Sequence, residues 1–60
     1  MTIYQCLFFS EEDVAYWENL EAEGDFAIQQ LLRERLARGE WSVAEAWRDN
    51  ELVCRVVAPR

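Results

Sequence analysis

The chain has no histidine and no lysine, and its 60 residues include only two cysteines, two glycines and one proline. Without histidine, two cysteines cannot complete a tetrahedral metal site, so we expect no metal and no other cofactor. Histidine is also the usual base beside a nucleophile, and Cys6 and Cys54 fall in predicted strands, where buried thiols are inert. The glycines, Gly24 and Gly39, are too isolated for a phosphate loop. We therefore expect that the protein is not an enzyme.

Long apolar runs are also missing: none approaches the roughly 18 residues that span a bilayer. Residues 1–6 show no basic segment leading into an apolar stretch, the pattern of a signal peptide. We expect a cytoplasmic protein without membrane contact, in which Cys6 and Cys54 are reduced. The alternative is a disulfide between Cys6 and Cys54, which requires that their strands are adjacent.

The chain is 52% hydrophobic with three tryptophans, which is enough for one compact domain over residues 1–60. A chain of this length buries only about 60% of the surface that its unfolded form exposes, so its stability is marginal without help. Oligomerisation is one usual source of help. Both a monomer and a homodimer are therefore compatible with the sequence.

Charge is divided unevenly along the chain. Residues 1–32 contain seven acids and no base. The acids are Glu11, Glu12, Asp13, Glu18, Glu21, Glu23 and Asp25. From Arg33 onward, six arginines face five acids, so the first part carries −7 and the second +1 of the net −6. Net charge influences which partners a protein attracts and how fast they associate. An acidic block of this kind predicts a surface that binds a basic partner.

Residues 3–9 are apolar on both faces and predict a central strand. Ser10 then resembles a helix N-cap, with Glu11, Glu12 and Asp13 filling the first turn. The helical pattern continues to Arg38. An unbroken helix would reach about 42 Å, so we place a break at residues 23–25, where Gly24 offers a stop.

The first predicted helix covers residues 11–23 and buries Val14, Trp17 and Leu20. The second ends at Gly39. Its predicted core residues are Phe26, Ile28, Leu31, Leu32 and Leu36. Both follow the spacing of an amphipathic helix.

Residues 41–47 and 52–57 predict a hairpin turning at Asp49-Asn50. Centring the turn there pairs Trp47 with Leu52, Glu45 with Cys54, Val43 with Val56, and Arg48 with Glu51. The predicted core face comprises Trp41, Val43, Trp47, Leu52, Cys54 and Val56. Glu45 on this face is either a functional acid, an edge carboxylate paired with Arg55, or a sign that the register differs by one residue.

The predicted fold is therefore α+β in the order β-α-α-β-β, with a three-stranded antiparallel sheet, helices on one face, and a frayed tail at 58–60. On the first helix, Glu11, Glu18 and Glu21 form a stripe that Asp25 would extend. Their axial steps are comparable to the spacing of DNA phosphates. Glu12 and Glu23 form a second acidic edge. A solvated helix face explains the same residues equally simply.

In size, in its acidic block over 11–25 and in having no catalytic motif, the chain resembles the small acidic inhibitors of phages and mobile elements, especially anti-CRISPR proteins. The resemblance implies a non-enzymatic inhibitor that covers a basic nucleic-acid-binding surface of a Cas effector in a bacterial host and blocks DNA binding, without binding nucleic acid itself. The partner-binding residues would be Glu11, Glu12, Glu18, Glu21, Glu23 and Asp25, with Tyr16 or Trp41 as an aromatic anchor. The alternative is a small homodimeric regulatory or antitoxin-like module, in which Trp41 and Trp47 pack on a second copy.

Overall fold

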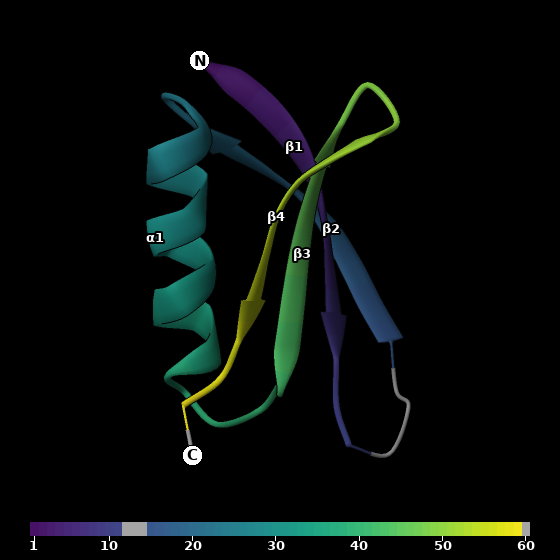
Figure 1. Ribbon diagram of the computed structural model, residues 1–60, viewed down its shortest axis with the longest axis vertical. Coiled ribbons are helices and arrows are strands. Elements are labelled where there is room, and N and C mark those ends of the chain that lie inside the picture. Colours follow the sequence, from purple (N-terminus) through teal and green to yellow (C-terminus); the bar gives the residue numbers. More distant parts are fainter. Residues whose placement is uncertain (12–14, 60) are drawn as a thin grey trace.

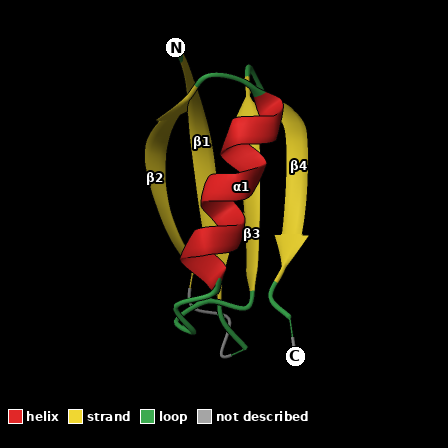
Figure 2. Cartoon of the chain, turned by 90° about the vertical axis from the view of Figure 1, so that its left-hand side faces the viewer, coloured by secondary structure: helices red, strands yellow, loops and turns green. Residues whose placement is uncertain are grey.

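In the described residues, a four-stranded antiparallel sheet in the order β2-β1-β3-β4 carries one helix on one face (Figures 1 and 2). The computed structural model describes residues 1–11 and 15–59. Its elements are β1 (Thr2–Phe9), β2 (Ala15–Ala22), α1 (Asp25–Leu36), β3 (Val43–Arg48) and β4 (Glu51–Val57). The α+β class is confirmed, and so is the central place of the first strand. The predicted order β-α-α-β-β with three strands is wrong.

The error lies in the second element, which is a strand and not a helix. β2 pairs with β1 along its whole length, from Thr2 opposite Ala22 to Phe9 opposite Ala15. Trp17 and Leu20, expected together on one face of a helix, therefore point to opposite faces of the sheet. Pairing with β1 overrides the helical spacing of the local sequence, as tertiary context commonly does. The predicted cap and core residues Glu12, Asp13 and Val14 lie outside the described residues.

The core lies between α1 and the sheet, and alternate residues of each strand point into it. β1 contributes Tyr4, Cys6 and Phe8, all fully buried. The buried helix residues are Ile28, Leu32 and Leu36. Below the helix, β3 contributes only Ala44 and Ala46, which are also fully buried. These two small side chains leave room for the helix to lie close to the middle of the sheet. Phe26 and Leu31, predicted in the core, are instead exposed.

The β3–β4 hairpin turns where the sequence predicted. Asp49 and Asn50 have φ values of 50° and 66°, as a two-residue type I′ turn requires. The pairs nearest the turn, Trp47 with Leu52 and Arg48 with Glu51, are confirmed. A bulge beside Ala46 and Trp47 then adds one residue to β4.

The bulge corrects the rest of the register. Glu45 lies opposite Arg55 and not Cys54, and Val43 lies opposite Val57 and not Val56. The predicted core face is wrong for β3 because its inward positions are the alanines. Val43 and Trp47 consequently point to the other face of the sheet.

Backbone hydrogen bonds define the chain just after α1 and just after β4. Gly39, at φ 86°, donates its N–H to the carbonyl of Leu36 at 3.1 Å and directs the chain away from the helix. In the segment predicted as a frayed tail, the N–H of Ala58 donates to the carbonyl of Ser42 at 2.7 Å. β4 therefore continues its contact with the β3 side of the sheet beyond Val57.

Candidate protein-binding surface

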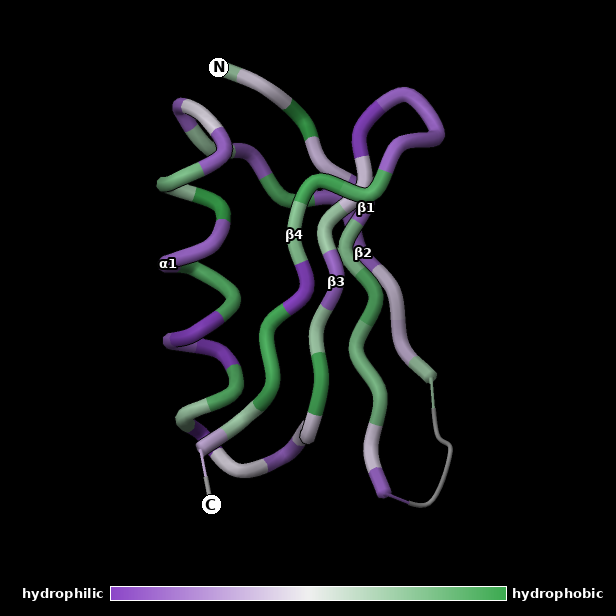
Figure 3. Tube along the Cα trace, in the orientation of Figure 1, coloured by the Kyte–Doolittle hydropathy of each residue, from purple (hydrophilic) through white to green (hydrophobic). Residues whose placement is uncertain are grey.

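In the described part of the chain, no helix covers the face of the sheet that points away from α1, and we call this face the open face (Figures 1 and 2). Strand alternation assigns its side chains. Eight of them are large and apolar, and each is half-buried or exposed. They are Ile3, Leu7, Phe9, Trp17, Val43, Trp47, Leu52 and Val57. Figure 3 shows apolar positions recurring along β1, β3 and β4, as expected for strands with an apolar residue on both faces.

The middle of the open face is hollowed. A depression of about 260 Å³ is lined by Gln5, Leu7, Trp17 and Trp47, which come from three neighbouring strands. Trp17 stands at its rim on the edge strand β2 with 61% of its surface exposed. An indole at the edge of an apolar hollow is a common anchor of protein interfaces.

The charged groups of the open face are few and largely paired with one another. Nε of Arg55 lies 3.6 Å from Oε2 of Glu45. The indole Nε1 of Trp47 donates a hydrogen bond of 3.2 Å to Oε1 of Glu45. Glu45 does pair with Arg55, but directly across from it and on an inner strand, because the register differs by one residue from the predicted one. Because Glu45 has two partners on its own face, covering this face leaves its charge compensated.

The structure does not assemble the predicted acidic stripe. Glu18 points toward α1 and Glu21 toward the open face, since they are an odd number of residues apart on one strand. Asp25 begins the helix, where it accepts hydrogen bonds from the hydroxyl of Tyr4 at 2.8 Å and from Nη1 of Arg48 at 3.0 Å. Glu11 and Glu23 are exposed in the connections before and after β2. Glu12 lies outside the described residues.

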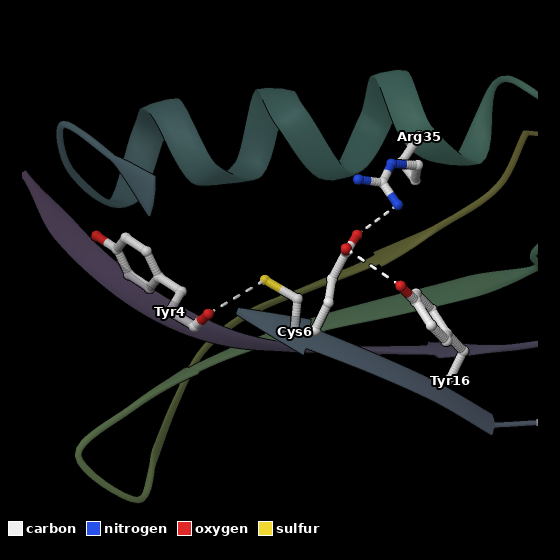
Figure 4. Close-up of polar contacts among 5 residues, drawn as sticks. Tyr4, Cys6, Tyr16 and Arg35 are labelled. Atoms are coloured by element: carbon white, nitrogen blue, oxygen red, sulfur yellow. Dashed lines mark hydrogen bonds and ion pairs between the residues drawn. The ribbon is translucent and has the colours of Figure 1, made fainter. Parts of the chain in front are cut away.

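Three of the predicted site residues, Tyr16, Glu18 and Trp41, lie together on the helix side of the sheet. Arg35 of α1 and Tyr16 of β2 approach the same carboxylate, that of Glu18 (Figure 4). Nη1 of Arg35 lies 2.5 Å from Oε1, and the Tyr16 hydroxyl donates to Oε2 at 3.2 Å. The Tyr16 ring in turn stacks on Trp41, with centroids 5.9 Å apart and planes 14° apart.

This cluster joins the helix to the sheet. The Arg35 guanidinium lies 5.3 Å from the centre of the Phe8 ring, within cation–π distance. The hydrogen bond to Glu18 is the main reason that the pKa of Tyr16 is raised above its usual value. Oε1 of Glu18 is buried and has only the Arg35 contact. Its surroundings are those of a structural ion pair and not of a surface offered to a partner.

The thiols lie apart. Cys6 and Cys54 both face Ala46, from opposite sides of β3. Two strand spacings amount to about 9–10 Å, which is beyond the roughly 7 Å that a disulfide spans. Burial is the main cause that raises the pKa of the Cys6 thiol, to about 11. Both cysteines are free in this fold.

Sequence reasoning missed Leu7 and Trp17 as surface residues, and it assigned Trp47 to the core. Residues 15–22 show no regular alternation of apolar and polar residues, since Trp17 follows Tyr16 and Asn19 follows Glu18, so the local sequence contained no signal for an outward Trp17. In β3, the signal was the pair of alanines, Ala44 and Ala46, which alternate with the larger residues that were assigned to the core.

Comparison of the chain with family models, with curated proteins and with solved structures gave no match. Among residues 1–11 and 15–59, no three cysteine, aspartate or glutamate side chains lie close enough together to hold a metal ion. In the same part of the chain, no helix has the length and apolarity needed to cross a membrane. We therefore base the functional argument on the open face and its surroundings.

Proposed function

We propose that this protein is a non-enzymatic protein-binding module, acting in the cytoplasm, and that the open face of the sheet is its binding surface. The observation that supports this proposal is the row of outward apolar side chains around the hollow between Trp17 and Trp47. Four of the large hydrophobic residues exposed in the described chain lie on this face. They are Ile3, Trp17, Leu52 and Val57.

An apolar face of this extent is costly to leave in water on so small a domain. Interfaces are distinguished by aromatic residues at the centre and by few charged groups there. The open face has this composition: two tryptophans lie beside the hollow, and among the described strand residues that point to this face only Glu21, Glu45 and Arg55 are charged. Its occupant in this proposal is a protein surface and not a nucleic acid, since it offers neither a basic groove nor an excess of cations.

Inhibition of a Cas effector stays a prediction. The acids on which it rested are divided among the helix side, the open face and the connections. Within residues 1–11 and 15–59, these acids therefore form no continuous strip that a single basic groove could contact. The apolar open face provides a better supported surface for either an inhibitor or a regulatory module.

Photo-crosslinking tests the proposal. A benzophenone amino acid replaces Trp17 in one variant and Phe26 in another, and both are expressed in the host cell. The two positions are matched, since Trp17 is 61% and Phe26 64% exposed, but Phe26 lies on α1. We expect a discrete protein adduct from position 17 and none from position 26. Adducts from position 26 alone, or only with nucleic acid, would refute the proposal.

A further inference from the structure

We infer that the open face binds a second copy of this chain, in a symmetric dimer in which the two sheets pack face to face. This inference rests on the proposed function, since it names the occupant of the same surface. Its first support is size. Four strands about 4.8 Å apart and roughly seven residues long, at about 3.3 Å per residue, cover about 440 Å².

Two such faces together remove roughly twice this area from water. The additional area of the side chains that project from the sheet is not included in this value. The result, about 880 Å², lies just below the ~1,000 Å² that a specific interface should exceed, so we expect a weak dimer. It also supplies what a 60-residue chain lacks, since it adds a second apolar layer on the side of the sheet that α1 leaves bare. Sheets packed in this way form the cores of β-sandwiches.

The second support is the distribution of charge. The molecule has a net charge of −6, so two copies repel each other unless they meet where the charge is sparse. The open face carries Glu21, Glu45 and Arg55, and the last two form an ion pair. The face therefore contributes about one negative charge, and the remaining excess lies elsewhere on the molecule.

The third support is the order of residues across the face. Strand register places Trp17, Leu7, Glu45 and Arg55 in one row, from the edge strand β2 to the edge strand β4. A two-fold axis that runs along the strands, between the sheets, reverses this row in the second copy. Trp17 of each copy then lies over Arg55 of the other, and both are largely exposed in the single chain.

This arrangement makes the contact twice. An arginine over an indole is the strongest of the common cation–π pairs, more so once water is excluded. Of the two neighbouring rows, one places Gln5 over Trp47 of the other copy, and the other brings apolar residues together. In it Phe9 lies between Ala15 on β2 and Val43 on β3, with Val57 beyond on β4, so reversal places Phe9 over Val43 of the other copy.

Sedimentation equilibrium on the purified chain tests the inference, from micromolar to several hundred micromolar, with Trp17→Glu and Phe26→Glu as matched variants. Each substitution replaces an exposed aromatic residue and adds one negative charge. We expect the native chain and Phe26→Glu to dimerise within a factor of about two of each other. Loss of the Trp17 anchor and of both of its contacts with Arg55 is expected to weaken the Trp17→Glu dimer by about 30-fold or more.

Salt provides a second readout. Screening reduces the repulsion between two acidic molecules, so the dimer should tighten as the salt concentration rises, whereas a complex with a basic partner weakens. A native chain that stays monomeric over the whole range, or equal weakening by both variants, would overturn the inference. If the purified chain is a monomer while position 17 still forms a protein adduct in cells, the second copy is wrong and the proposed function stands.

Discussion

Glu18 and Arg35 form an ion pair of 2.5 Å that joins the edge strand β2 to the helix α1. Both side chains are about three-quarters covered, with 27% and 29% of their surface exposed. Oε1 of Glu18 is itself buried. An acid that appeared in the sequence to be part of a partner surface therefore has a partner inside the molecule.

We expect Glu18→Lys to lower the free energy of unfolding by about 2 kcal/mol, because it leaves two cations facing each other under partial cover. Glu21→Lys is the matched control. It changes the charge by the same amount on the same strand, at a position that is exposed on the open face, and should change stability by less than about 0.5 kcal/mol. Urea unfolding of both variants checks this. Equal effects would show that the pair does not hold the helix to the sheet.

The pair itself can be separated from the packing of its side chains by a double-mutant cycle. Arg35→Met alone should be the costlier single change, since it leaves the buried oxygen of Glu18 without a cation. Glu18→Leu combined with Arg35→Met should cost less than the sum of the two single changes. Additive costs would contradict a direct interaction.

The hydroxyl of Tyr4 gives a smaller and cleaner test. Tyr4→Phe keeps the buried ring and removes the hydrogen bond of 2.8 Å to Asp25, so we expect a loss of about 1 kcal/mol. Tyr16→Phe removes a longer and exposed bond of 3.2 Å to Glu18 and should cost clearly less. Thermal unfolding of the two variants measures the difference, and the reverse order would be inconsistent with the placement of Tyr4 against the helix N-terminus.

Cys6 should resist thiol reagents as long as the protein is folded. Its pKa is about 11, mainly because it is buried, and thiolate is the reactive form. In a Cys54→Ala background at pH 8, modification of Cys6 should be many times slower in buffer than in urea. A similar rate in both solvents would mean that the strand β1 is not covered by the helix.

The same thiol makes stability depend on pH. Its folded pKa is above the ordinary value of 9.0, so the folded state retains a proton that the unfolded state releases. The stability associated with this group is complete below pH 9 and is lost as the pH rises through 11. Tyr4 and Cys54 shift in the same direction, chiefly through burial, so Cys6→Ala should reduce this loss but not abolish it.

The turn at Asp49 and Asn50 gives a prediction about the hairpin. At Asn50, where φ is 66°, glycine is favoured and a β-branched residue is strained. Asn50→Gly should raise the free energy of unfolding by about 0.5 kcal/mol, and Asn50→Val should lower it by 1 kcal/mol or more. Glu51→Val, one residue further into the strand, is the control and should be nearly neutral.

The parts of this fold that were predicted correctly from the sequence are those determined by interactions between neighbouring residues. The strand up to Phe9, the turn at Asp49-Asn50 and the helix from Asp25 all have short-range signals, namely a β-branched and aromatic run, residues that tolerate positive φ, and apolar spacing closed by Gly39. Each depends on a few neighbouring residues. These predictions were correct to within one or two residues.

The parts that the sequence did not predict depend on distant partners. Residues 15–22 fit a helix by spacing, and only pairing with β1 makes them a strand. The acid Glu18 resembles a solvated residue until Arg35 is placed above it. Likewise, the open face could not be predicted, since the bulge in β4 and the small residues Ala44 and Ala46 determine which face of the hairpin is covered.

The position of β1 has a consequence for how the molecule is made. β1 precedes every other element in the chain, yet it lies in the middle of the sheet and pairs with both β2 and β3. During synthesis on the ribosome, β1 can pair with β2 soon after both strands emerge. Its other edge pairs with β3, which is synthesised only after the whole helix. Until then, the nascent chain carries an unpaired and apolar strand edge. Such an edge readily pairs with a strand of another chain and leads to aggregation. The rate of translation between Asp25 and Val43 is therefore expected to influence how much of this protein folds and how much aggregates.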